Sequence, residues 1–133
     1  MAENIAITWR RIPERYRLEA TRDPQTGEVF FPPRVLSPTR RRKAKLEKIT
    51  LSGQGEIFSY TQVNSAPAGL EKTTPYVLAI IKLNEGPMLT SQVVEVEEKD
   101  VKIGDKVEMI FRKIRSDDPE GLLHYGYKFR KVT

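Results

Sequence analysis

The sequence contains no cysteine and a single histidine among its 133 residues. The absence of cysteine excludes a disulfide framework and is typical of proteins in a reducing cytosol. No apolar run approaches the ~20 residues that a membrane-spanning helix needs, and the N-terminus lacks the apolar stretch of a signal peptide. We therefore expect a cytoplasmic protein with no membrane partner.

Catalytic groups are equally scarce. His124 is the one centre around which a histidine dyad could form, and its sequence neighbours offer no partner for acid–base catalysis. We expect it to be a half-exposed structural residue in a strand. The acidic run at 95–100 has a spacing that matches no cation-wrapping loop, so we interpret it as a solvated strand end. The sequence therefore predicts a protein that is not an enzyme.

Positive charge is concentrated in the first third of the chain, although the net charge is only +5. Residues 1–48 hold 12 Lys and Arg against 6 Asp and Glu, whereas residues 49–133 hold 11 against 12. The same point separates an arginine- and proline-rich segment from one with the pattern of strands. We predict a helical segment at 1–20, a ribbon at 21–48 and a barrel at 49–133.

The N-terminal stretch ITWRRIPERYRLEA carries one apolar stripe among arginines. Trp9, Ile12 and Tyr16 are spaced as on one face of a helix. Pro13 fits the first turn of a helix but not its middle, which predicts two short helical pieces meeting near Ile12, or one beginning there. Trp9 and Tyr16 either pack on the protein's own core or form a docking surface, since Trp and Tyr are favoured interface anchors.

Period-two alternation from residue 49 onward predicts five strands. The first lies in LSGQGEIFSYTQV, where Gly53 and Gly55 indicate a bulge or a sharp bend. The others are PYVLAIIKL, MLTSQVVEV after a turn at 84–87, the segment after Gly104, and LLHYGYKFRKV, with a short turn or helical piece at EEKD. This arrangement predicts a mainly-β fold built on a closed five-stranded OB-type barrel.

Alternation also assigns the strand faces. In the first strand Ile57, Ser59, Thr61 and Val63 alternate with Phe58 and Tyr60; in the fourth, Val107, Met109 and Phe111 are expected to face inward; in the last, Leu123, Tyr125, Tyr127 and Phe129 share one face.

Residues 23–40, DPQTGEVFFPPRVLSPTR, have the outline of a zinc ribbon without zinc ligands. Two tight-turn segments, at 23–27 and 37–40, flank an aromatic and proline-rich hairpin. Cysteines at 23, 26, 37 and 40 would have the spacing of a zinc ribbon. Without them, a thiolate zinc site is excluded.

The strongest charge feature is RRRKAK at 40–45, with Arg34 just upstream. Such a cluster is either a solvated tether or a site for phosphates, from nucleic acid or from a nucleotide-bearing cofactor such as coenzyme A. An OB barrel favours nucleic acid, but the barrel segment is near neutral. Its second and third strands carry only Tyr76, where base stacking would need several aromatic residues. Nucleic-acid binding is therefore the alternative and not the favoured interpretation.

The segments WRRIPERYRLEA, FFPPR, LSGQGEIFSYT, PYVLAIIKLNEGP, VKIGDKVEMIFRKI and YGYKFR resemble, in consistent order, the zinc-ribbon/OB-fold proteins that accompany thiolase-like and other acyl-CoA enzymes. The sequence is most similar to archaeal members encoded with acetoacetyl-CoA thiolase and hydroxymethylglutaryl-CoA synthase. The resemblance implies a rubredoxin-like ribbon before the OB barrel. It also implies a non-catalytic subunit that bridges these two enzymes in the mevalonate pathway to isoprenoids and helps shape a shared coenzyme A site.

The resemblance also assigns positions. The family's four zinc ligands fall on Asp23, Thr26, Ser37 and Arg40, so we expect no zinc. We expect Asp23 and Arg40 to form an ion pair there, with Thr26 and Ser37 hydroxyls as further partners, unless Arg40 turns outward to the basic run.

The candidate partner contacts are the aromatic residues Trp9, Tyr16, Phe30 and Phe31, and the candidate contacts to acidic groups or coenzyme A phosphates are Arg34, Arg41, Arg42 and Lys43. No cofactor is expected to bind tightly to the chain alone. A nucleic-acid-binding OB protein and a stand-alone acyl-CoA-binding protein are the alternative functions.

Overall fold

The structure, a computed structural model, describes residues 4–68, 70–116 and 123–132. The first three residues of the predicted helical segment and the predicted start of the last strand at Leu122 lie outside these ranges. The elements are α1 (Ile5–Arg10), α2 (Ile12–Arg17), β1 (Glu19–Arg22), β2 (Val29–Phe30), β3 (Glu47–Thr50), β4 (Gln54–Val63), β5 (Tyr76–Leu83), β6 (Met88–Val94), the 3-10 helix η1 (Glu98–Asp100), β7 (Lys106–Ser116) and β8 (Leu123–Lys131).

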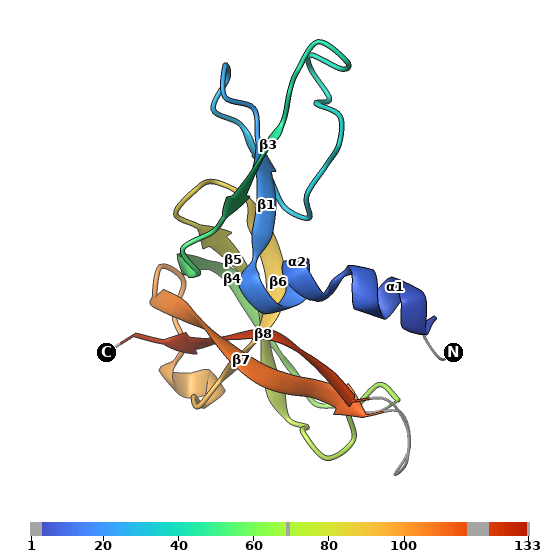
Figure 1. Cartoon of the computed structure of the whole chain (residues 1–133). Helices are drawn as coiled ribbons and strands as arrows, with labels where there is room; N and C mark the ends of the chain where they lie inside the picture. Colours follow the sequence, from blue (N-terminus) through green and yellow to red (C-terminus); the bar gives the residue numbers. More distant parts are fainter. Residues whose placement is uncertain (1–3, 69, 117–122, 133) are drawn as a thin grey trace.

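Strands β4 to β8 close into a five-stranded barrel in the order β4-β5-β6-β8-β7 (Figure 1). All neighbouring pairs are antiparallel except β6 and β8, which run parallel and pair at Val93↔Phe129 and Val94↔Arg130. The short helical piece expected at EEKD is η1, in the connection after the third barrel strand. The predicted mainly-β fold with an OB-type barrel is confirmed.

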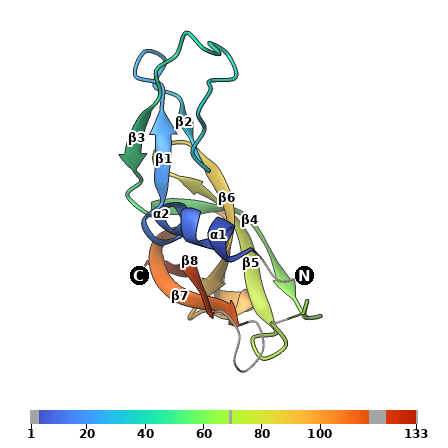
Figure 2. The ribbon, with the colours of Figure 1, turned by 45° about the vertical axis from the view of Figure 1, so that its right-hand side comes forward.

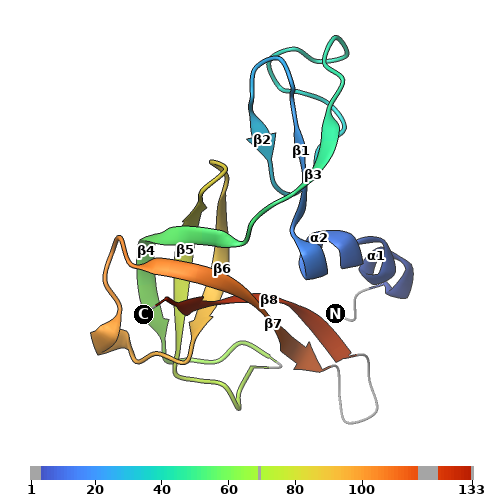
Figure 3. The same cartoon turned by 60° about the vertical axis from the view of Figure 1, so that its left-hand side comes forward.

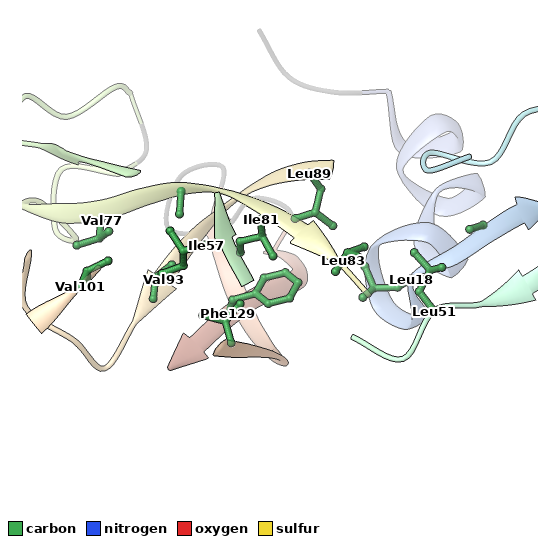
Figure 4. Close-up of a cluster of buried hydrophobic side chains, with 13 residues drawn as sticks. Leu18, Leu51, Ile57, Val77, Ile81, Leu83, Leu89, Val93, Val101 and Phe129 are labelled. Atoms are coloured by element: carbon green, nitrogen blue, oxygen red, sulfur yellow. The ribbon is translucent and has the colours of Figure 1, made fainter. Parts of the chain in front are cut away.

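The core fills the barrel and continues to the base of the ribbon. Ile57, Ile81 and Phe129 are buried at its centre. Successive side chains of a strand point to opposite faces, and these three occupy inward positions. In Figure 4, Leu18 and Leu51 lie beside Leu83 at one end of this cluster. Helix α2, the ribbon and the barrel therefore share one hydrophobic core.

The ribbon is a three-stranded sheet in the order β2-β1-β3, which projects from one end of the barrel (Figure 2). Both neighbours are antiparallel to β1, which pairs with β3 from Glu19↔Thr50 to Arg22↔Glu47. The predicted boundary between residues 48 and 49 falls inside β3.

The two predicted helical pieces are present and meet at Arg11. Asn4 caps α1 by accepting a hydrogen bond from the Ala6 N–H at 2.9 Å, and Pro13 lies in the first turn of α2, where its missing N–H costs nothing. Leu18 ends α2 in the left-handed conformation. Neither helix in the described part of the chain has the length and apolar character needed to cross a lipid bilayer.

The predicted bulge in the first barrel strand lies further along than expected. Pairing of β4 with β5 shifts between Ile57 and Ser59, so Phe58 is the extra residue and is half exposed, rather than Gly53 or Gly55. Gly55 has a different role, since a Cβ there would lie 2.5 Å from the Lys82 carbonyl oxygen. Only glycine allows this approach of β4 to β5.

Two assignments of strand faces were wrong because a helix covers the residue, and a third was wrong because the bulge in β4 puts Tyr60 on the core side together with Ile57. Phe111 does not face the barrel interior; it is 46% exposed and packs edge-to-face on Tyr16 of α2, with 4.8 Å between ring centroids. His124 is buried rather than half exposed, because α2 packs against β8. In both cases the helix covers the outside of the barrel, which alternation within a strand does not reveal.

Candidate functional site

The centre of the ribbon holds an ion pair between two of the positions that the resemblance assigned to zinc ligands. The Arg40 Nη1 donates to both carboxylate oxygens of Asp23, at 2.8 Å and 3.1 Å. Asp23 follows β1 and is fully buried, whereas Arg40 comes from the loop between β2 and β3 and is about a quarter exposed. The predicted ion pair is confirmed, and it joins the two turn segments at 23–27 and 37–40.

Local backbone geometry explains why Asp23 points inward. Its N–H donates to the Glu28 carbonyl at 2.9 Å and its own carbonyl accepts from the Gly27 N–H at 2.8 Å, which closes the turn. Its carboxylate also accepts from the Gln25 N–H at 3.0 Å. Burial raises the pKa of Asp23, but this hydrogen bond and the Arg40 guanidinium together hold the pKa below its ordinary value. Asp23 is therefore ionised at neutral pH.

The two other positions that the resemblance assigned to zinc ligands, Ser37 and Thr26, form hydrogen bonds only within their own turns. The buried Ser37 hydroxyl accepts from the Arg40 N–H at 3.2 Å and so holds the second turn. Thr26 is exposed and its hydroxyl accepts from the Glu28 N–H at 3.4 Å. The prediction that the Thr26 and Ser37 hydroxyls would be further partners of the ion pair was therefore wrong, since the Ser37 hydroxyl contacts the backbone of Arg40 and the Thr39 hydroxyl. One carboxylate already bound by a guanidinium, with two hydroxyls, does not fit Zn²⁺.

We expect the purified protein to contain far less than one zinc per chain and to stay folded in excess chelator. The reason is the donor set: the described residues contain no group of three or more His, Asp or Glu side chains placed to hold a metal. Elemental analysis and circular dichroism with chelator provide the measurement. About one zinc per chain after extensive dialysis would contradict this expectation.

Breaking the ion pair should destabilise the ribbon, and single substitutions should do more harm than the double one. Asp23→Asn leaves a guanidinium without its counter-ion and Arg40→Met leaves a buried carboxylate, whereas Asp23→Asn with Arg40→Met leaves no charge. Urea unfolding of the four proteins measures this order. A loss in the double variant equal to the sum of the two single losses would show that the charges do not interact.

The same pair predicts a dependence on pH. Because the folded pKa of Asp23 is lowered, its contribution to stability is complete above the unfolded pKa, about 4, and is lost as pH falls through the folded value. Thermal unfolding from about pH 7 to about pH 3 should show a steeper fall for the natural protein than for Asp23→Asn. Parallel curves would contradict the assignment.

The ribbon loop, defined as residues 31–46 between β2 and β3, combines basic and apolar exposed side chains. Arg41, Arg42 and Lys43 are exposed, and Val35 and Leu36 are exposed beside them, Val35 by 88%. Residues 36–43 line a hollow of about 770 Å³. Exposed apolar groups next to cations are the composition expected of a surface that binds an acidic partner.

The ribbon loop is held to the sheet at its start. The Arg34 N–H donates to the Thr21 hydroxyl at 2.9 Å, and the Arg34 guanidinium lies over the Phe30 ring, 5.3 Å from its centroid. Phe31 packs edge-to-face on Tyr127 of the barrel, with 5.9 Å between centroids. Phe30 thus holds the start of the loop, and Phe31 ties the ribbon to the barrel. Both phenylalanines are only partly exposed.

Helix α1 projects sideways from the molecule (Figures 1 and 3). Its exposed apolar residues, Ile5, Ile7 and Trp9, are called the α1 surface. Ile5 and Trp9 are each 74% exposed, and no α1 residue in the described chain is buried. Tyr16 differs, because it packs on Phe111, which stacks in turn on Tyr125 at 5.5 Å. Of the two aromatic residues in the predicted stripe, Trp9 is the one left open to a partner.

Sequence reasoning missed several residues of these surfaces. Val35 and Leu36 follow two prolines and a basic residue, and an apolar pair before a basic run could have indicated them. Ile5 lies four residues before Trp9 and so continues the predicted stripe, whereas Ile7 lies two residues before Trp9 and is out of phase with it. Lys128, buried in β8, had no sequence signal at all, since a lysine in a strand normally faces solvent.

Comparison with known proteins gives consistent similarities. The chain is 45% identical over 133 residues to a DUF35 domain-containing scaffold protein of Methanothermobacter thermautotrophicus, covering 100% of this chain and 99% of the relative. A protein of the same name from Methanocaldococcus jannaschii is 46% identical over 128 residues, with 96% and 91% covered. The Pyrococcus furiosus protein of this name is 40% identical, with 96% and 93% covered.

Domain and structure comparisons agree. The family described as ChsH2, C-terminal OB-fold domain, matches residues 48–112. A solved structure described as the Ltp2-ChsH2(DUF35) aldolase aligns with a TM-score of 0.72 and 23% identity, over 100% of this chain and 98% of its own. At this identity the structural likeness shows the fold alone.

Proposed function

The chain belongs to the family of DUF35 domain-containing scaffold proteins, and from this premise we propose that it is a non-catalytic bridge between acetoacetyl-CoA thiolase and hydroxymethylglutaryl-CoA synthase. The scaffold-type role follows from the family. The identity of the two enzymes is supported by the sequence resemblance to proteins that accompany them.

The observation that carries the bridging proposal is the presence of two separate exposed surfaces of different chemistry. The α1 surface is apolar and includes Trp9, whereas the ribbon loop is strongly basic. A six-residue helix has too few hydrogen bonds to be stable by itself, and α1 packs mainly on α2. Its apolar residues are therefore suited to burial against a partner, while the ribbon loop is suited to a second, acidic one.

Coenzyme A fits the proposal at the ribbon loop. Arg34, Arg41, Arg42 and Lys43 are exposed there and could bind the cofactor's phosphates where bridge and enzyme meet. The chain contributes charge and position and no reacting group. A bridge has value because formation of acetoacetyl-CoA is uphill, so the next condensation must consume it promptly.

The test is to mix the purified thiolase and synthase with and without this protein and to measure mass in solution. We expect one complex containing all three chains, and no thiolase–synthase complex without the bridge. Trp9→Ala should remove one enzyme and leave the other bound, whereas Phe58→Ala, an exposed aromatic residue on the barrel, is the matched control. Association of the two enzymes without the bridge, or no binding to it at low salt, would overturn the proposal.

A further inference from the structure

A hollow of about 350 Å³ lies where β6 and β8 separate. The two strands pair only at Val93↔Phe129 and Val94↔Arg130, and no earlier pair joins them in the described chain. The Ser91 hydroxyl spans the opening with a long hydrogen bond, 3.5 Å, to the Tyr127 carbonyl. Beyond that contact, Arg15 of α2 completes the lining.

A buried lysine lines this hollow. Lys128 is only 7% exposed, and within the described residues it forms no hydrogen bond or ion pair with an acidic side chain. Burial lowers the pKa of Lys128, and the nearby Arg112 lowers it further. Arg112 has its own counter-ion, Glu95, at 3.0 Å. Burying a charged ammonium group in this way lowers the stability of the fold unless an anion is bound next to it.

The other charged groups in the lining are also cationic. Arg15 and Arg115 line the hollow, together with His124, and none of the described lining residues is acidic. The hydroxyls of Thr90 and Ser91 add neutral hydrogen-bonding groups on the β6 side. With Lys128 protonated, three positive charges surround one hollow, which matches an anion with more than one negative charge better than a single carboxylate.

We propose that the hollow between β6 and β8 is a phosphate-binding site that takes a phosphate or diphosphate group of a small molecule, with Lys128 as its buried cationic contact. Its volume is within the range of small-ligand sites and would hold a diphosphate together with part of an attached group. The site is on the barrel, away from the ribbon loop, and does not depend on the bridging function.

The test is calorimetric titration of the full chain with inorganic phosphate and pyrophosphate, and with acetate at equal ionic strength. We expect binding of pyrophosphate and phosphate and none of acetate. Lys128→Met should weaken pyrophosphate binding about tenfold or more, since it removes a charge-assisted contact. It should also raise the unfolding temperature in anion-free buffer, because it removes a buried unpaired charge. ADP distinguishes the ligand's source, since affinity above that of pyrophosphate indicates a nucleotide.

Controls separate this site from general charge attraction. Lys113→Met removes the same charge from an exposed position of β7 and should leave pyrophosphate affinity unchanged. Lys128→Arg keeps the charge and should retain most of the binding. The Lys128 side-chain pKa, followed by NMR, should rise when pyrophosphate binds. Equal weakening by both methionine variants, equal binding of acetate, or an unchanged Lys128 pKa would overturn the proposal.

Discussion

Reversing charge at Arg41 and Arg42 is expected to weaken assembly with one of the two enzymes by about tenfold or more at low salt. Both side chains are exposed on the ribbon loop, beside the apolar Leu36, so Arg41→Glu with Arg42→Glu turns attraction to an acidic partner into repulsion. The difference in affinity between the natural protein and the variant should shrink as salt rises, since exposed charges more than about 8–10 Å apart are largely screened at physiological ionic strength. Light scattering of the mixed proteins across a salt series measures it.

The matched control reverses two exposed lysines away from the ribbon loop, Lys72→Glu with Lys113→Glu. It makes the same change in net charge and should leave assembly nearly intact. Neither double variant should change the unfolding temperature greatly, because none of the four residues is buried. A similar loss of assembly in both would mean that only net charge matters and that the ribbon loop is no specific contact.

The largest loss of stability is expected from Leu18→Ala, at about 2–5 kcal/mol of unfolding free energy. Leu18 is fully buried where α2, the ribbon and the barrel meet, and its carbonyl accepts from the Leu51 N–H at 3.1 Å. Removing its side chain leaves a cavity at the junction through which the ribbon is held to the barrel. Urea unfolding monitored by circular dichroism provides the free energy.

Leu36→Ala makes the same chemical change at an exposed position and should alter stability by less than about 0.5 kcal/mol. The pair therefore separates the effect of cavity formation from that of the substitution itself. A loss from Leu18→Ala as small as that from Leu36→Ala would mean that ribbon and barrel are not packed on a common core.

The barrel could be predicted from sequence because its strands follow simple alternation. In β5, buried apolar residues occupy every second position from Val77 to Leu83, and turn residues separate β5 from β6. The Asp23–Arg40 pair could be predicted because a ribbon brings four fixed positions together, and two of them carry opposite charges. In both cases a local pattern determines a contact between distant residues.

The prediction of which residues face the barrel interior failed after a register shift. The bulge at Phe58 inserts one residue into β4, and a second shift lies between Lys113 and Arg115 in β7. Each shift exchanges inward and outward positions after it, so counting by twos assigns the wrong face. No residue type in these stretches marks the insertion, since neither is a glycine or a proline.

Burial caused by another element was equally unpredictable. Phe111 and His124 depend on where α2 lies, and Lys128 depends on the separation of β6 from β8. These are relations between elements far apart in the sequence, and one sequence holds no direct record of them. The basic run was evident from the sequence. Its apolar neighbours Val35 and Leu36 could be assigned to the same surface only because the structure shows them exposed.

The crosslink between Asp23 and Arg40 also changes which chemical damage the ribbon can suffer. A zinc ribbon held by thiolates is lost when oxidants convert its cysteines to sulfenic or higher acids, and it must obtain its metal again after each loss. A carboxylate and a guanidinium have no such oxidation states and need no metal supply. The ribbon therefore forms its central crosslink from the polypeptide alone, at the moment of folding, and keeps it under peroxide exposure that would open a thiolate site.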